Sequence, residues 1–233
     1  KIKIDGIILC VWVVGLFTSC EKDLDQYSGT DYIRFIPDFT EDSLDYCFGL
    51  AGKTDVDRIG IEVKISGEVT AYDRDYSLRV NTASTAQEGV HCNIPEQNCK
   101  IRANHVTDTL WIEILNQPEL KNKQVYLQLD LVENENFRLC FSDNNSCKVY
   151  LTDQVGWPEW WDEWHETDGL GKYSEKKYRL FIQVSGIADL GAVEYPEKRE
   201  AILKFKYYLE EEADNGNVIL DEDNRPMTVA MYG

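Results

Sequence analysis

Alternation of apolar and polar residues is the sequence feature that most constrains the fold of this chain. Successive side chains of a β-strand point to opposite faces, so an apolar residue at every second position gives a strand one apolar face. Such strands bury that face against a second sheet. The alternating residues are Leu44, Tyr46, Phe48 and Leu50; Ile59, Ile61, Val63 and Ile65; Tyr76, Leu78 and Val80; Leu110, Ile112 and Ile114; and Val125, Leu127, Leu129 and Leu131.

The alternating segments lie within residues 30–152, where short turns rich in glycine or asparagine separate them. Strands that follow one another at such intervals usually pair in antiparallel fashion. We therefore expect residues 30–152 to form an immunoglobulin-like antiparallel β-sandwich. The fold class is expected to be mainly β, with this sandwich followed by a smaller α-rich C-terminal region over residues 153–233.

The hydrophobic pattern changes near Gly156. Trp157, Trp160, Trp161 and Trp164 stand at positions i, i+3, i+4 and i+7, the spacing of one stripe of an α-helix. Proline is tolerated in the first turn of a helix, so the proline after Trp157 fits this interpretation. The spacing predicts a short helix that carries these tryptophans.

Two further helices and a terminal hairpin are expected within residues 153–233. Ser174 is a suitable N-cap for a helix that runs through Val184, although residues 178–184 also have the composition of a strand. The apolar spacing predicts a clearer helix from about Glu197 to Glu212. In the tail, a polar turn between two apolar arms predicts a hairpin.

Residues 1–19 resemble the signal peptide of a bacterial lipoprotein. Lysines precede an apolar run over residues 7–17, which is too short to span a bilayer of about 30 Å. The run ends in Phe17-Thr18-Ser19-Cys20, which resembles a lipobox. The resemblance implies that Cys20 becomes the first residue of the mature chain and carries fatty-acyl groups such as palmitate. The alternative is ordinary signal-peptide cleavage nearby, with an incidental Cys20.

Residues 20–29 form a short acidic tether. Within it, Glu21-Lys22-Asp23-Leu24-Asp25-Gln26 resembles the acidic export signal of surface lipoproteins in Bacteroidota. That resemblance implies a lipid-anchored protein of the outer membrane, exposed at the cell surface. A solvated spacer has the same composition and is the alternative.

The charge of the chain argues against nucleic acid as a partner. The chain has 24 Lys and Arg residues against 42 Asp and Glu residues, a formal net charge of −18. A phosphate backbone would be repelled by this charge.

Three stretches together resemble the DUF4843 family, lipoproteins of unknown function from Bacteroidota that accompany SusC/SusD-like uptake systems. They are Ile61-Glu62-Val63-Lys64-Ile65-Ser66-Gly67 with Asp73-Arg74-Asp75-Tyr76; Ser84-Thr85-Ala86-Gln87-Glu88-Gly89-Val90; and Gly171-Lys172-Tyr173-Ser174-Glu175-Lys176-Lys177. The resemblance implies an outer-membrane, nutrient-uptake context and supplies no catalytic residues.

The middle stretch also resembles Calx-beta sandwiches, which raises a calcium site at residues 73–76 as an alternative. From the residues, we expect Arg74 to pair with a carboxylate and Tyr76 to enter the core.

Cysteines are the next candidates for a role. Cys92 and Cys99 flank one turn-like segment, and Cys140 and Cys147 flank another, so each pair is a candidate disulfide in an exported protein. Cys47 would then remain unpaired, and it could serve a redox role. Buried thiols at all of these positions would fit the sequence too, as would a zinc site made by His91, Cys92, Cys99 and His105.

The tryptophan cluster is the candidate ligand site. Indole faces can stack on sugar rings, so Trp160 and Trp161 are candidate ligand-binding residues. Packing of the same side chains at the domain junction is the competing interpretation. His165 and Glu166 lack a third group that would orient them for catalysis, so we expect them to lie on the solvated surface.

The sequence contains no recognisable catalytic motif. We therefore expect that the protein is not an enzyme and that it binds no cofactor and no metal ion. The expected function is non-catalytic. A lipid-anchored outer-membrane protein would assist the capture of a glycan or peptide nutrient, together with a SusC/SusD-like system. The competing hypotheses are a structural or adhesive surface protein that binds no small ligand, and a periplasmic enzyme.

Overall fold

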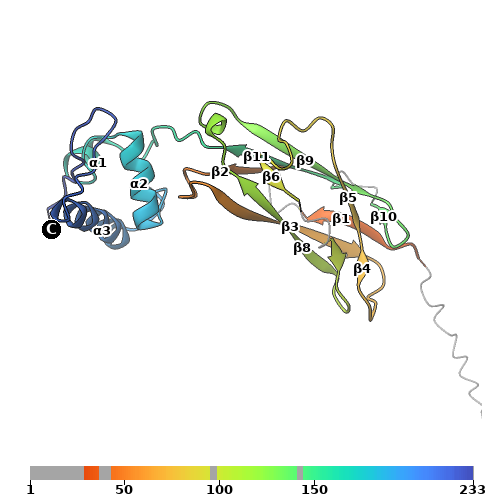
Figure 1. Cartoon of the computed structure of the whole chain (residues 1–233). Coiled ribbons are helices and arrows are strands. Elements are labelled where there is room, and N and C mark those ends of the chain that lie inside the picture. The colour runs from red at the N-terminus through yellow and green to blue at the C-terminus, as the bar shows by residue number, and fades with distance from the viewer. Residues whose placement is uncertain (1–28, 37–42, 95–98, 141–143, 233) are drawn as a thin grey trace, which may run out of the picture.

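The computed structural model describes residues 29–36, 43–94, 99–140 and 144–232. The described chain is mainly β, with a small helical region at its C-terminal end (Figure 1). Residues 1–28 lie outside the description, so the predicted signal peptide, the lipidation site at Cys20 and nearly all of the tether stay predictions.

The larger of the two main sheets has five strands. Their spatial order is β10 (Arg138–Leu139), β1 (Tyr32–Ile36), β3 (Val56–Ser66), β8 (Thr107–Leu115) and β6 (Cys92–Asn93). The long central pair β3 and β8 is antiparallel, with Gly60 opposite Trp111 and Ile61 opposite Leu110. The alternation predicted at residues 59–65 and 110–114 is confirmed, because the even face of β8 and the odd face of β3 are buried.

The second main sheet has four strands. Their spatial order is β2 (Ser43–Cys47), β11 (Ser146–Thr152), β9 (Val125–Val132) and β5 (Ser77–Val80). A small separate sheet pairs β4 (Arg74–Asp75) with β7 (Lys100–Ile101), and a 3-10 helix spans Pro118–Lys121. The predicted strand over residues 44–50 ends early, at Cys47, because the chain turns there and Ala51 N donates to Cys47 O at 2.9 Å.

One apolar core lies between the two main sheets. Phe35 and Val63 enter it from the five-stranded sheet, while Leu129 and Val149 enter it from the four-stranded sheet. Not every strand pair is antiparallel, as the sequence led us to expect, since β1 pairs with β10 and β2 pairs with β11 in parallel. Both pairs join segments that are far apart in sequence, and alternation within a strand carries no information about such a partner.

A second apolar core belongs to the helical region. Its helices are α1 (Glu163–Thr167), α2 (Glu175–Ser185) and α3 (Tyr195–Asp214). Phe181 of α2 meets Phe205 of α3 edge to face, with ring centroids 5.6 Å apart. The predicted Ser174 cap is confirmed, because its side chain accepts a hydrogen bond from Lys177 N. The predicted helix over residues 197–212 is also confirmed, with two more residues at each end.

The predicted tryptophan helix is wrong. Only α1 forms in this segment, and it begins after Asp162, whose side chain accepts from His165 N as an N-cap. Residues 157–161 precede that cap in a non-helical turn, so helical spacing does not describe how the indoles are arranged. The tail turns back on itself through an antiparallel bridge between Leu220 and Pro226, as the hairpin prediction required.

The two ends of the described chain lie far apart. The first described residues enter β1 at one end of the sandwich, whereas the helical region lies beyond the opposite end (Figure 1). Among the described residues, no helix combines the length and apolar character needed to cross a membrane.

Candidate functional site

An aromatic cluster lies where the sandwich meets the helical region. The segment between β11 and α1 contributes Trp157, Trp160 and Trp161, and the residues around α2 contribute Tyr173 and Tyr178. These rings contact one another at centroid distances of 4.5 to 6.3 Å. We call these five side chains the junction aromatic cluster.

Trp161 is the buried centre of the junction aromatic cluster. Its side chain is only 2% exposed, and its Nε1 donates to Gly171 O at 3.1 Å. Its ring meets Tyr173 and Tyr178 edge to face. No ring face of Trp161 is available to a ligand, so the packing interpretation applies to this residue rather than the ligand-binding one.

Trp160 lies between the buried centre and solvent. Its ring stacks on Trp161 with centroids 5.3 Å apart and planes 22° apart. It borders a shallow hollow of about 590 Å³. The other lining residues are Leu50, Pro158, Glu159, Tyr178, Ala188, Asp189 and Gly191. Of the two tryptophans proposed from the sequence, Trp160 is therefore the one that a ligand can reach.

Trp157 is the exposed member of the cluster and was missed as a candidate. It is 60% exposed, and its ring stacks on Tyr173 with centroids 4.5 Å apart and planes 23° apart. Its Nε1 donates to Trp161 O at 3.1 Å, which fixes the orientation of the indole. The assumed helical stripe hid this residue, because it placed every tryptophan on one buried face.

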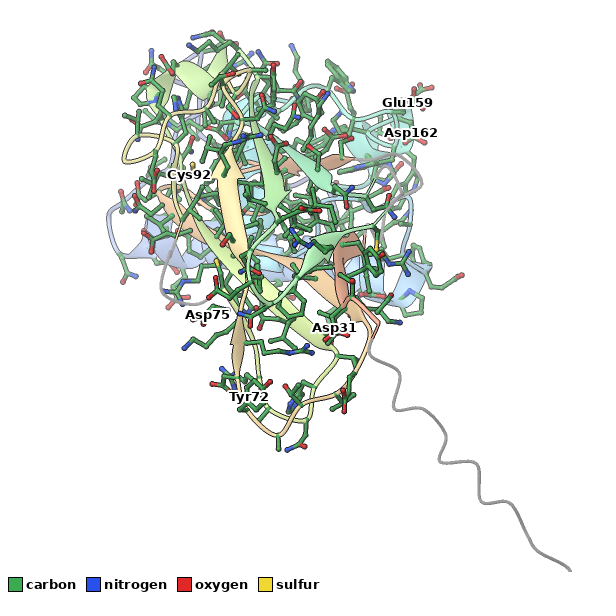
Figure 2. The ribbon with its side chains drawn as sticks, turned by 90° about the vertical axis from the view of Figure 1, so that its right-hand side faces the viewer. Asp31, Tyr72, Asp75, Cys92, Glu159 and Asp162 are labelled. Carbon is green, nitrogen blue, oxygen red and sulfur yellow. The ribbon has the colours of Figure 1, made fainter. Side chains whose placement is uncertain are left out.

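Two carboxylates stand beside the hollow. Glu159 is on the turn between Trp157 and Trp160, and Figure 2 shows it close to Asp162 on the outside of that segment. Asp189 Oδ1 accepts from Gly191 N at 2.7 Å and from Ala192 N at 3.2 Å. Carboxylate oxygens accept hydrogen bonds from hydroxyl groups, so the hollow joins an aromatic wall to acceptors for a polyhydroxylated ligand.

His165 is buried, which corrects the expectation that it lies on the solvated surface. Only 4% of the residue is exposed, its Nδ1 lies 2.7 Å from Asp162 Oδ1, and its ring contacts Trp160 edge to face. The hydrogen bond from His165 holds the pKa of the Asp162 carboxyl below its ordinary value. Glu166 is half-buried and accepts from Tyr173 N at 3.3 Å. Both residues therefore fix the loop around α1.

Tyr178 closes the inner side of the hollow. Its hydroxyl donates to Ala188 O at 2.7 Å, and burial raises its pKa to about 12. The hydroxyl is therefore a neutral donor at physiological pH.

The candidate disulfide pairs do not flank hairpins. Cys92 is in β6, which pairs with β8, whereas Cys99 precedes β7, which pairs with β4. Cys140 follows β10 of the five-stranded sheet, whereas Cys147 is in β11 of the four-stranded sheet. The structure gives these residues as thiols, not as disulfides. The prediction assumed that each pair spans the two arms of one hairpin, and the described strands around these cysteines are not paired in that way, so the disulfides stay a prediction.

The residues considered for zinc have other partners. His91 Nδ1 accepts from Gln87 N, and His91 Nε2 is 2.8 Å from Glu119 Oε1. His105 Nδ1 is 2.8 Å from Ala103 O. Within the described ranges, no group of three or more His, Cys, Asp or Glu side chains is arranged to hold a metal ion.

The expectation for Asp73-Arg74-Asp75-Tyr76 is confirmed. Arg74 is buried, with Nη1 paired to Asp31 and Nη2 donating to Glu68 O at 2.8 Å. Tyr76 is buried in the sandwich core and donates to Asp108 Oδ2 at 2.7 Å. This segment therefore fastens the end of the sandwich at which the described chain begins.

Comparison with known proteins gives one family match. The model "Domain of unknown function (DUF4843)" matches residues 27–187, which include the sandwich, the junction aromatic cluster and α2. No curated protein matches the chain.

Solved structures show weaker similarity. CBD12 from CALX1.2 is 11% identical with a TM-score of 0.38, over 52% of this chain and 43% of that chain. A proposed carbohydrate binding protein from Bacteroides ovatus is 13% identical with a TM-score of 0.38, over 53% and 37%. A two domain protein with unknown function from Bacteroides fragilis is 15% identical with a TM-score of 0.33, over 53% and 45%. The chain thus spans less than half of each of these structures.

Proposed function

Because the chain belongs to the DUF4843 family, whose model matches residues 27–187, we propose that it is a lipid-anchored, non-catalytic outer-membrane protein that captures a nutrient glycan for uptake. One observation carries the proposal, namely the exposed indole of Trp157 held flat against Tyr173. The orientation of this large exposed ring is fixed before a ligand binds. Binding therefore costs little side-chain conformational entropy.

The chemistry of the junction suits a neutral glycan better than an acidic peptide. The hollow bordered by Trp160 has the partly exposed ring of that residue and the carboxylates of Glu159 and Asp189. Sugar rings offer apolar C–H faces for aromatic stacking, and their hydroxyl groups donate to carboxylate oxygens. An acidic rim is less suited to an acidic peptide, because two carboxylates repel each other.

The position of the cluster supports capture at a distance from the membrane. The described chain begins at the end of the sandwich opposite the helical region (Figure 1). An acyl chain on Cys20 would therefore hold the sandwich between the membrane and the junction aromatic cluster. Each buried methylene of the anchor contributes about 0.8 kcal/mol, so several acyl chains together hold the protein firmly.

We also propose the finer assignments that accompany this role. The sandwich is of the immunoglobulin-like kind, the anchored protein faces the cell surface, and its partner is a SusC/SusD-like transporter. The resemblance to lipoproteins that accompany SusC/SusD-like systems and the lipobox-like residues 17–20 support these assignments.

Binding of neutral oligosaccharides tests the capture function. The protein and its Trp157→Ala variant are screened on a glycan array, with Tyr207→Ala as a control that removes an exposed aromatic ring of α3 outside the cluster. Trp157→Ala is expected to abolish a glycan signal that Tyr207→Ala retains. A screen without any glycan signal would contradict capture and leave the structural or adhesive role.

A further inference from the structure

A second hollow opens on the outer face of the five-stranded sheet and shares no residue with the one at the junction. Its volume is about 420 Å³, within the range of roughly 300 to 1,000 Å³ typical of small-molecule sites. Its lining residues are Lys100, Arg102, His105, Thr107, Asp108, Thr109 and Trp111. They come from β7, from β8 and from the turn between these strands.

Trp111 forms the aromatic part of this hollow. It is 55% exposed on β8 and stands directly opposite Gly60 of β3. A Cβ atom at Gly60 would lie 3.3 Å from Trp111 Cζ3 and 2.8 Å from Thr109 Cγ2. The absence of a side chain at Gly60 therefore lets the indole lie close against the neighbouring strand while much of the ring stays open to solvent.

The basic side chains at this hollow contrast with the charge of the whole chain. The protein has a net charge of −18, yet Lys100, Arg102 and His105 line the same hollow as Trp111. Of the acidic groups here, Asp108 is engaged by the hydroxyl of Tyr76, and Asp75, labelled in Figure 2, lies 3.7 Å from Lys100 Nζ. Glu62 of β3 stands opposite Thr109 and adds a further negative charge at the margin.

We propose that this hollow binds an acidic saccharide, a sugar that carries a carboxylate or a sulfate. The indole of Trp111 stacks on the apolar face of the pyranose ring, and the guanidinium of Arg102 pairs with the anionic group. The hydroxyl groups of Thr107 and Thr109 exchange hydrogen bonds with the sugar hydroxyls. A purely electrostatic polyanion site would not need the aromatic ring, and a purely apolar surface would not need the cations.

The experiment measures binding by isothermal titration calorimetry. The probes are oligogalacturonate and a chondroitin sulfate oligosaccharide, each with a neutral counterpart, namely methyl-esterified oligogalacturonate and desulfated, carboxyl-reduced chondroitin. We expect at least one acidic probe to bind in preference to its neutral counterpart, and higher salt to weaken this binding. Trp111→Ala and Arg102→Gln are each expected to weaken it by about tenfold or more.

Matched variants separate the site from general effects. Arg58→Gln removes the same charge as Arg102→Gln from an exposed position on β3 outside the lining, and it is expected to leave binding unchanged. Gly60→Ala displaces the indole without removing it and is expected to weaken binding. Trp157→Ala, at the junction, is expected to bind the acidic probe like the unmodified protein. The inference is overturned if neither acidic probe is preferred over its neutral counterpart, or if Trp111→Ala and Arg102→Gln bind as Arg58→Gln does.

Discussion

Arg179 of α2 donates from Nη1 to Asp153 Oδ1 at 2.6 Å, and this ion pair joins the helical region to the sandwich. Asp153 follows β11 directly and is almost completely buried, and Arg179 Nη2 donates to its main-chain oxygen as well. Asn116, just beyond β8, donates to the other carboxylate oxygen of Asp153 at 3.3 Å. The junction that positions the aromatic cluster is therefore held by one buried carboxylate.

Removing that carboxylate should destabilise the junction. Asp153→Ala leaves the guanidinium of Arg179 without its buried partner, and breaking a buried ion pair in this way typically costs about 3 to 5 kcal/mol. We expect the free energy of unfolding in urea to fall by about 3 kcal/mol for this reason. Lys53→Gln removes an exposed ion pair with Asp57 at 3.9 Å. This control should change the free energy of unfolding by less than about 0.5 kcal/mol. Equal effects from the two variants would contradict the structural role of Asp153.

Lys177 should make stability depend on pH. Its ammonium is buried and donates to the main-chain oxygens of Leu170 and Lys172, and burial lowers its pKa from 10.5 to about 8. Between these pH values Lys177 holds a proton in the unfolded chain that it has released in the folded chain. This group therefore increases the free energy of unfolding as pH rises from about 8 to 10.5.

The measurement is the free energy of unfolding between pH 7.5 and 9.5 for the protein and for Lys177→Met. The variant should lack the increase in the free energy of unfolding that Lys177 gives as pH rises. The difference in the free energy of unfolding between the two proteins should therefore change steadily over this range. A difference that is independent of pH would show that Lys177 titrates at its ordinary pKa.

Ser174 should stabilise α2 through its cap. Its side chain accepts from Lys177 N at 3.1 Å, and Ser→Ala at an N-cap typically costs about 1 kcal/mol. Thermal unfolding should show this loss for Ser174→Ala and little change for Ser174→Asp, because aspartate also caps helices. Ser66→Ala, at an exposed strand end, is the control. Equal stability of Ser174→Ala and the unmodified protein would contradict the cap.

Cys92 should react slowly in the folded protein. It is buried in β6, and burial together with the charge of Glu88 raises its pKa to about 11. The thiolate is the reactive form, so iodoacetamide at pH 8 should label Cys92 only after unfolding. Peptide mapping by mass spectrometry checks this. Recovery of Cys92 as a disulfide with Cys99 would contradict the structure and restore the pairing expected from the sequence.

The strands were predictable where one sheet face is apolar. Residues 59–65 and 125–131 alternate strictly because their odd positions enter the shared core. The parallel pairing of β2 with β11 was not predictable, since it joins residues 43–47 to residues 148–152 through contacts that no local pattern encodes.

The candidate site was predicted in composition but not in arrangement. The tryptophan-rich segment does lie at the junction. The helical spacing of its tryptophans, however, predicted a helix that includes Trp157, whereas Asp162 is the N-cap and the helix begins only after it. Exposure of Trp157 and burial of Trp161 follow from that cap and from the partners Tyr173 and Gly171, which come later in the chain. Trp111 was not singled out, because its exposure depends on Gly60 of the neighbouring strand.

The most direct test of the account is calorimetric titration of the neutral oligosaccharide that gives the strongest signal on the glycan array. The unmodified protein and Tyr207→Ala should bind it, while Trp157→Ala should bind it about tenfold more weakly or not at all. Trp111→Ala, in the other hollow, should bind it normally. Equal affinities for Trp157→Ala and the unmodified protein would contradict the claim that the junction aromatic cluster captures a glycan.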